Sequence, residues 1–505
     1  MSPVRDALLL LFIGGLAAGL AFTPVARRLG RRLGLVDRPD GRRKVHERTT
    51  PVAGGLAVFA AVILVLGVFG VAGRGPVAEE VREHAWELLG LLGGAAVICL
   101  VGVADDGYRL RGRYKLCGQV AAIGVVLLTG SRIEVLAIFG REFDLGWAAI
   151  PFTTLFLLGA INSLNLLDGM DGLLGTVGTI ICGAIAVLAV YAGHPAEACV
   201  AAGLAGALAG FLRYNMPPAS VFLGDAGSML IGLAVGVLAI RSSLKGPATA
   251  ALAAPLALLA IPFFDTAAAV VRRKLTGRSI FSTDRGHIHH CLQRTGLSGP
   301  AVLLVVGGLC AVTVAGVLAS IAFQNEGLAV LSALVVVVIL VATKVFGYAE
   351  LRLVMHSGRH LARSVLGSDR DNARLEVRLH GSAGWDGLWV RLTDCVDRLN
   401  LRSIALDVNA PAQQEVYHAR WRRPGPATSE ALEDWSAVIP LTAWGHAVGQ
   451  VIVIGRPDAE PVWRKLAVLT GVTDDVEAVL ARSAPIPTLA GPTAVPESLV
   501  GAGSA

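Results

Sequence analysis

Long apolar stretches separated by short polar segments make up the chain as far as residue 346. Such stretches predict helices that cross a lipid bilayer, because about 20 apolar residues in a helix span its hydrocarbon core. We expect about 11 transmembrane helices on this basis. The predicted spans are residues 7–26, 52–73, 87–104, 116–131, 147–164, 173–192, 196–212, 226–240, 248–268, 301–322 and 327–346.

After residue 350 the long apolar stretches end and charged residues become frequent. Segments of strand character and two segments of helical periodicity, 385–399 and 460–482, predict a small α+β domain there. The predicted strands are 373–379, 403–409, 415–423, 434–444 and 448–455. We therefore predict an α-helical polytopic membrane domain at 1–346, a soluble α+β domain at 351–483 and a disordered tail at 484–505.

Lysine and arginine are distributed unevenly between the segments that connect the predicted helices. With the N-terminus outside, the inward segments carry 20 of these residues and the outward segments carry 7. Positively charged connections face the cytoplasm, so the C-terminal domain is predicted to be cytoplasmic. The inward segments are 27–51, 105–115, 162–172, 213–225 and 269–300.

The composition excludes an ordinary soluble enzyme. Hydrophobic residues make up 54% of the chain, charged residues make up 16%, and the mean hydropathy is +0.63. None of the seven cysteines has the spacing of a metal or redox pair, so we interpret them as small apolar residues.

Each inward segment contains one polar cluster, and the first of these is basic. It includes Lys44 and His46 and leads into Gly54-Gly55. We interpret it as a phosphate-binding segment in which the glycines allow close backbone approach. A simple positive-inside anchor also explains its arginines.

The second cluster begins with Asp105 and Asp106 at the end of an apolar span. Adjacent carboxylates repel each other unless a cation or a proton lies nearby. A divalent cation would satisfy them, and so would a solvated turn in which they pair with neighbouring cations. Those cations are Arg109, Arg111, Arg113 and Lys115.

The third cluster follows an apolar span and contains two amides and two carboxylates. A carboxylate at membrane depth costs about 2.5 to 3.5 kcal/mol, which favours a functional reason for it. Residues three apart are neighbours on a helix, so Asn162, Asn165 and Asp168 predict a ladder of oxygen ligands and donors. Asp171 follows one turn later. Mg²⁺ prefers one or two such carboxylates together with phosphate oxygens.

The fourth cluster contains Asn215 and then Asp225, which has a glycine before it and another two residues later. Its position at a predicted helix start favours anion binding, although Asp225 as a plain helix cap is an equal alternative.

The fifth cluster includes Arg278 and the histidines His287, His289 and His290. Three histidines suggest zinc, but no cysteine is suitably spaced, and the surrounding arginines favour an anionic ligand. Asp265 adds an acid at the end of the ninth predicted helix.

Taken together, these clusters resemble those of the polyprenyl-phosphate N-acetylhexosamine-1-phosphate transferases. The resemblance covers residues 1–346 and does not extend to the tail. It is carried by the strings DRPDGRRKVH with PVAGG, ADDGYRLRGRYKLCGQ, NSLNLLDGMDGL, VFLGDAGS and RGHIHH, in this order.

The resemblance implies transfer of a sugar phosphate from a UDP-sugar to undecaprenyl phosphate, with release of UMP and a requirement for Mg²⁺ or Mn²⁺. It implies that Asp225, with Asp168, binds the metal and that Asp105, Asp106 and Lys115 are catalytic. The implied substrate-binding residues are Lys44, His46, Asn162, Asn165, Asp168, Asp171, Asn215, Arg278, His287, His289 and His290.

The form H-x-H-H at 287–290 is similar to the branch that uses UDP-N-acetylglucosamine, so GlcNAc-1-phosphate is the expected group transferred. The alternatives are a phospho-N-acetylmuramoyl-pentapeptide transferase and, more distantly, a secondary transporter. The expected partners are the UDP-N-acetylhexosamine, undecaprenyl phosphate and the bilayer of a bacterial inner membrane. A homodimer is one possible assembly, and no nucleic acid partner is expected.

Overall fold

The chain divides into two compact units, Met1–Leu351 and Arg352–Ala505. In this computed structural model the described residues are 2–37, 49–138, 141–242, 253–275, 286–348, 350–352, 354–355, 373–380, 385–410, 415–423, 434–443, 446–474 and 476.

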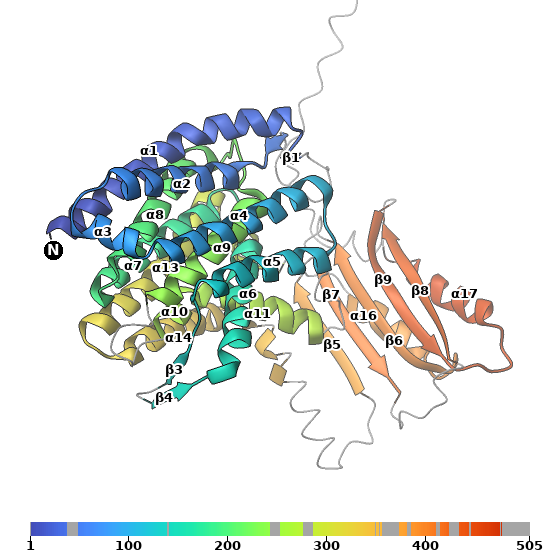
Figure 1. The fold of residues 1–505 in the computed structure, drawn as a ribbon. Helices are drawn as coiled ribbons and strands as arrows, with labels where there is room; N and C mark the ends of the chain where they lie inside the picture. The colour runs from blue at the N-terminus through green and yellow to red at the C-terminus, as the bar shows by residue number, and fades with distance from the viewer. Residues whose placement is uncertain are drawn as a thin grey trace, which may run out of the picture. The chain divides into compact units, whose positions relative to one another are not determined.

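The first unit is a bundle of apolar helices (Figure 1). Its helices are α1 (Ser2–Arg32), α2 (Gly54–Ala72), α3 (Pro76–Glu83), α4 (Ala85–Tyr108), α5 (Gly112–Leu128), α6 (Ala149–Leu167), α7 (Leu173–Ala192), α8 (Pro195–Asn215), α9 (Gly224–Arg241), α10 (Ala253–Leu258), α11 (Ala260–Leu275), α12 (Ile288–Arg294), α13 (Gly299–Ala322) and α14 (Glu326–Ala342).

Within the described residues, eight of these helices are long and apolar enough to cross a membrane, namely α1, α2, α4, α6, α7, α8, α9 and α13. The predicted spans 116–131, 248–268 and 327–346 coincide with α5, with the pair α10 and α11, and with α14, which are helical but shorter. The multi-pass helical character is therefore confirmed, whereas the count of 11 spans is not.

Glycines allow α1 and α8 to pack with their backbones in contact. Gly15 lies against the backbone of Gly203, and Gly206 lies against the backbone of Phe12, so neither position has room for a side chain. In a membrane no hydrophobic driving force brings helices together, so their association depends on close van der Waals packing. Small residues at the interface allow this close packing. This packing holds the N-terminal helix within the bundle.

Short elements connect the helices at both ends of the bundle. Strand β1 (Val36–Asp37) pairs antiparallel with β2 (Thr50–Pro51), and β3 (Val135–Ile138) pairs antiparallel with β4 (Arg141–Asp144), which is followed by the 3₁₀ turn Gly146–Ala148. Helix α3 buries Val77, Ala78 and Val81.

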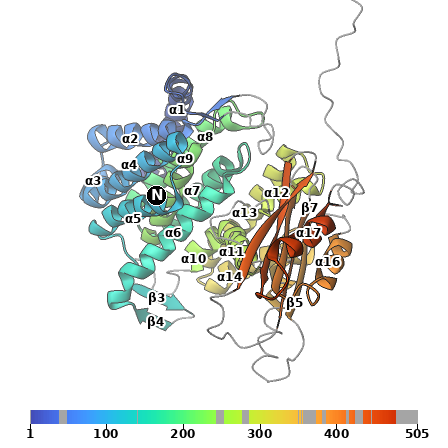
Figure 2. The ribbon, with the colours of Figure 1, turned by 90° about the vertical axis from the view of Figure 1, so that its right-hand side faces the viewer.

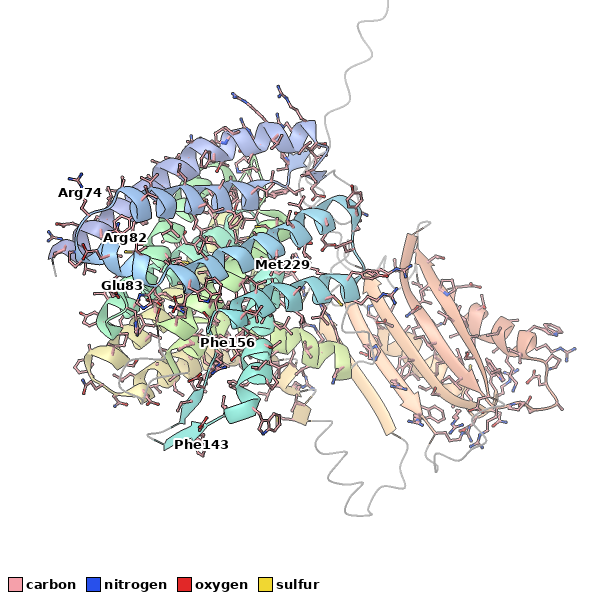
Figure 3. The ribbon with its side chains drawn as sticks, in the orientation of Figure 1. Arg74, Arg82, Glu83, Phe143, Phe156 and Met229 are labelled. Atoms are coloured by element: carbon pink, nitrogen blue, oxygen red, sulfur yellow. The ribbon has the colours of Figure 1, made fainter. Side chains whose placement is uncertain are left out.

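Arg82 of α3 donates from one guanidinium nitrogen to the carbonyl oxygens of Gly70 and Gly73, at 3.1 and 3.2 Å. It therefore satisfies carbonyl groups at the C-terminal end of α2. Arg74, Arg82 and Glu83 lie at one end of the bundle, whereas Phe156 and Met229 lie among the helices (Figure 3).

Helix α9 is the most enclosed element that bears on the site, and it packs against α2, α4, α6 and α7 (Figure 2). Gly55 of α2 and Gly102 of α4 lie directly against the backbone of Ala226 and Gly227 and leave no room for a side chain. The sequence suggested that Gly54-Gly55 approaches a phosphate. In the structure their backbone N–H groups donate to the carbonyl oxygens of Phe222 and Leu223, so they anchor the start of α9.

The second unit contains a five-stranded antiparallel sheet in the order β5-β7-β6-β9-β8. Helices α16 and α17 pack against its core, which includes Trp385, Leu406, Val451 and Leu469. The predicted strand-containing C-terminal region is thus confirmed, and the predicted disordered tail, 484–505, lies outside the described residues. The elements are β5 (Ala373–His380), α16 (Trp385–Asp394), β6 (Leu401–Ala410), β7 (Glu415–Arg422), β8 (Trp435–Ala443), β9 (His446–Gly455) and α17 (Val462–Thr473).

Candidate active site

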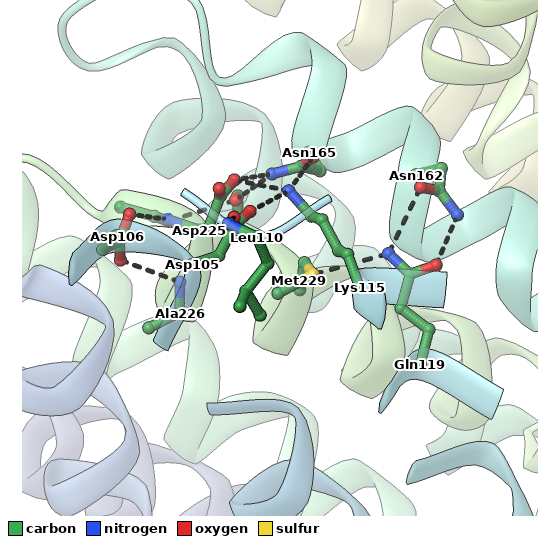
Figure 4. Close-up of polar contacts among 12 residues, drawn as sticks. Asp105, Asp106, Leu110, Lys115, Gln119, Asn162, Asn165, Asp225, Ala226 and Met229 are labelled. Carbon is green, nitrogen blue, oxygen red and sulfur yellow. Dashed lines mark hydrogen bonds and ion pairs between the residues drawn. The ribbon is translucent and has the colours of Figure 1, made fainter. Parts of the chain in front are cut away.

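The polar clusters meet at the end of the bundle where α4 and α6 end and α5 and α9 begin (Figure 4). Helix α4 stops because Arg109 takes a left-handed conformation, with φ 52°. Its N–H donates to the carbonyl oxygen of Asp105, and the N–H of Leu110 donates to Oδ1 of Asp105 at 2.7 Å. This turn places Lys115 in the first turn of α5, facing the end of α4.

Lys115 connects the second, third and fourth clusters. Its ammonium Nζ lies 3.0 Å from Oδ2 of Asp105 and 3.0 Å from Oδ1 of Asp225, and it donates to Oδ1 of Asn165 at 3.3 Å. Asn165 in turn donates through Nδ2 to Oδ1 of Asp225 at 2.6 Å and to Oγ of Ser228 at 2.7 Å. Residues 60 positions apart in the chain thus share one network.

Asp106 contacts the start of α9. Its Oδ1 accepts from the N–H of Asp225 at 2.9 Å, and its Oδ2 accepts from the N–H of Ala226 at 3.4 Å. A carboxylate at this place satisfies free N–H groups and the positive end of the helix dipole. Gly224 precedes them with φ 70°, and a Cβ atom there would meet the Asp106 carboxylate.

The segment after α6 adds a partly buried acid. Burial, followed by the negative charges of Asp225, Asp106 and Asp171, raises the pKa of Asp168 to about 8. These charges act on Asp168 because it lies near the same acids. A nearby cation would favour its charged form.

Asp171 and Asn215 use their polar groups within the protein. Oδ2 of Asp171 accepts from the N–H of Ala219 at 2.8 Å. Asn215 accepts from the N–H of Gly172 at 3.0 Å and donates to the carbonyl oxygen of Val221 at 2.9 Å. These two residues therefore shape the loops around the site.

Asn162 lies one turn before Asn165 on α6 and forms a reciprocal amide pair with Gln119 of α5. The two hydrogen bonds measure 3.2 and 3.0 Å, and Asn162 also donates to the carbonyl oxygen of Leu158. The pair joins α5 to α6 one turn from Lys115. It therefore helps to position the ammonium group of Lys115 beside the acids.

The histidine segment is held by Asp265 of α11. Oδ2 of Asp265 lies 2.8 Å from Nδ1 of His287, and Oδ1 accepts from the N–H of Ile288 at 2.9 Å. The ring of His289 lies against Gly169 and leaves no room for a side chain there. Burial lowers the pKa of His289 well below its ordinary value, and the positive charges of His290, His287 and Arg294 lower it further. The fifth cluster thus borders the third.

Three of the predicted substrate-binding residues, Lys44, His46 and Arg278, lie outside the described residues. Sequence reasoning did not single out Ser228, although it lies three residues after Asp225 on a helix and was therefore a detectable neighbour. It did not pair Gln119 with Asn162 or Asp265 with His287, because 43 and 22 residues separate them in the chain.

The acidic residues fit a hard divalent cation. The carboxylates of Asp105 and Asp225 both lie 3.0 Å from the ammonium Nζ of Lys115, and acids gathered in this way repel each other unless cations lie nearby. Within the described part of the chain, no three His, Cys, Asp or Glu side chains already surround one metal position. Mg²⁺ needs only one or two carboxylates, because waters and phosphate oxygens complete its shell.

The fold and site together define a multi-pass membrane protein with a carboxylate, amide and lysine cluster at one end of its helices. Residues 88–243, which carry most of this cluster, match the family described as Glycosyl transferase family 4.

Named relatives extend the match over a larger share of the chain. The chain is 33% identical over 297 residues to a probable undecaprenyl-phosphate N-acetylglucosaminyl 1-phosphate transferase of Bacillus subtilis, which covers 58% of this chain and 80% of that protein. It is 32% identical over 366 residues to a decaprenyl-phosphate N-acetylglucosaminephosphotransferase of Mycobacterium tuberculosis, covering 68% and 89%. It is 29% identical over 289 residues to an undecaprenyl-phosphate alpha-N-acetylglucosaminyl 1-phosphate transferase of Escherichia coli, covering 56% and 75%.

The chain belongs to the polyprenyl-phosphate N-acetylhexosamine-1-phosphate transferase family, and the predicted membership is confirmed.

Proposed function

We propose that this protein transfers N-acetylglucosamine-1-phosphate from UDP-N-acetylglucosamine to undecaprenyl phosphate. The relatives named above act on undecaprenyl or decaprenyl phosphate with the same sugar, which supports this substrate pair. The observation that carries the proposal is the single network of Asp105, Lys115, Asn165 and Asp225. The product would initiate a cell-envelope polysaccharide.

The reaction is a displacement at phosphorus. An oxygen of the lipid phosphate attacks the phosphorus that carries the sugar, and the bond from that phosphorus to the bridging oxygen breaks. UMP leaves with the bridging oxygen and its electron pair. The acceptor is already an oxyanion, so the main demands are alignment and neutralisation of charge.

Lys115 meets part of this demand. Its ammonium group is held between two carboxylates and an amide, so its position is set before a substrate binds. A pre-positioned cation stabilises charge that develops on phosphate oxygens without reorganising in the reaction. Asp225 and Asp168 would hold the Mg²⁺ or Mn²⁺, which supplies further charge neutralisation when bound.

The remaining residues would hold the nucleotide sugar. His287, His289 and His290 border the acidic segment through the contact of His289 with Gly169. Asp106 accepts a hydrogen bond from the N–H of Asp225. In the proposed mechanism it also orients the acceptor phosphate or takes its proton. Asp171, Asn162 and Asn215 contribute by fixing the loops and helices on which the other residues lie.

The site is proposed to face the cytoplasm of a bacterial inner membrane. The excess of lysine and arginine in the connecting segments on this side supports the orientation. The C-terminal α+β domain would then be cytoplasmic as well.

The direct test is UMP release by the purified full-length protein with undecaprenyl phosphate and a panel of UDP-N-acetylhexosamines. We expect release with UDP-N-acetylglucosamine and its loss after chelation of divalent cations. Consumption of UDP-muramoyl-pentapeptide alone would favour the peptidoglycan alternative. Absence of UMP release with every sugar nucleotide would contradict the enzymatic proposal and favour the alternative of a secondary transporter.

A chain that ends at Leu351 is expected to retain transfer within about twofold of the full-length protein. The reason is that every described site residue lies in the first unit, Met1–Leu351. The measurement is kcat and KM of both chains in the same detergent, with gel filtration as the control for folding. A folded but inactive shortened chain would show that the second unit takes part in catalysis.

A further inference from the structure

Helix α11 contacts the histidine segment at two points on one side. Asp265 and Arg272 are seven residues apart, which places them two turns apart on the same face of the helix. Asp265 binds His287 and Ile288 through its two oxygens. The guanidinium group of Arg272 lies flat against Gly286, where no side chain would fit.

Arg272 is fixed by an acid from the end of the first unit. It forms an ion pair through a guanidinium nitrogen with Oε1 of Glu350, and the side chains of Arg272 and Glu350 are 4% and 11% exposed. A buried arginine needs such a partner, because an uncompensated charge in a protein interior is costly. The bidentate shape of the guanidinium group allows it to contact a carboxylate and a peptide at the same time.

The chain just before Glu350 is also attached to α11. Phe346 and Phe264 form an edge-to-face contact with ring centroids 5.3 Å apart. Gly347, with φ 81°, lies against the same Phe264 ring. Phe264 directly precedes Asp265, so Phe346, Gly347 and Glu350 support α11 beside both residues that hold the histidine segment.

We propose that Glu350 is a positioning residue for the nucleotide-sugar subsite, and that it acts through Arg272 on Gly286 and the histidines that follow. The inference rests on the proposed function and adds to it a support that lies outside the five polar clusters of the sequence. It makes the last turn before the C-terminal domain part of the active-site framework.

The test compares two full-length variants that each lose one buried ion pair. In Glu350→Gln, Arg272 keeps a hydrogen-bond acceptor but loses the negative charge. The matched control is Glu197→Gln, because Glu197 pairs with Arg241 at 2.6 Å with side chains 4% and 12% exposed. That pair lies at the far end of α9, where α8 begins.

Glu350→Gln is expected to raise KM for UDP-N-acetylglucosamine by about tenfold or more, in the range typical of residues that orient a ligand-binding group. KM for undecaprenyl phosphate should stay within about twofold, because the histidine segment acts on the nucleotide sugar. Glu197→Gln should leave both KM values within about twofold, although its Tm also falls.

Two further variants keep the inference testable if Glu350→Gln does not fold. Glu350→Asp keeps the charge, and its KM for the nucleotide sugar should stay close to that of the wild type. Arg272→Lys keeps the charge but loses the flat contact with Gly286, and should raise KM for the nucleotide sugar.

An unchanged KM in both Glu350→Gln and Arg272→Lys would overturn the inference, as would an equal rise in Glu197→Gln. Absence of UMP release by the wild-type protein in the same assay would instead contradict the proposed function.

Discussion

Asp225→Asn is expected to reduce the rate of transfer by about 10³-fold or more. Asp225 lies in the first turn of α9, and its carboxylate contacts both Lys115 and Asn165. Its side chain is 30% exposed, so a ligand can reach it. The amide keeps the shape of the carboxyl group but removes the negative charge that would hold a divalent cation.

The variant should remain folded. Lys115 keeps its contact with Asp105, and removing one charge relieves repulsion among the acids. The measurement is UMP release together with Tm in detergent. Asp144→Asn is the control, because Asp144 lies in the β3–β4 hairpin and accepts only a local hydrogen bond from Gly146 among its described contacts. Activity of Asp225→Asn above a few per cent of wild type would contradict its role.

The helices were predictable because their apolar composition is continuous over the length of a bilayer. Their ends were less predictable. The first predicted span stops at residue 26, whereas α1 continues to Arg32, because Arg31 and Arg32 are favourable in the last turn of a helix. The ninth predicted span is divided between α10 and α11, the second of which carries Arg272, Arg273 and Lys274 in its last turn.

The gathering of acids at one end of the bundle was also predictable, because each polar cluster follows or precedes an apolar span at a connection predicted to face the same side. The pairing of individual side chains was not. Asn162 is predicted to bind the substrate, and its pairing with Gln119 on another helix could not be read from the sequence. Periodicity places a residue on a helix and on a face, and it does not identify a partner on another helix.

The strands of the C-terminal domain were recognisable from alternation of apolar and polar residues, as in β6, where Ile404, Leu406 and Val408 are buried. The hairpin of β3 and β4 was not, because each strand is only four residues long. Helix α12 is likewise only seven residues long, too short for helical periodicity to emerge. The predicted histidine loop therefore contains a short helix that begins directly after His287.

Asp106→Asn is the second substitution expected to lower transfer by about 10³-fold or more, and it separates two roles of this residue. As a partner of the N–H group of Asp225, Asp106 could be replaced by asparagine, whose single amide oxygen can keep the 2.9 Å hydrogen bond and loses only the longer one from Ala226, at 3.4 Å. Asparagine could not replace Asp106 as a group that orients or deprotonates the acceptor phosphate, because the amide carries no charge and takes no proton.

We therefore expect Asp106→Asn to keep a Tm near that of wild type while UMP release is lost. Asp106→Ala, which removes the acceptor as well, should lower Tm in addition, since two N–H groups at the start of α9 then lose their partner. The pair of variants thus measures the contribution of charge apart from that of helix capping. Substantial activity in Asp106→Asn with loss in Asp106→Ala would restrict Asp106 to holding α9, and would leave Asp105 as the carboxylate beside Lys115 that acts on the acceptor.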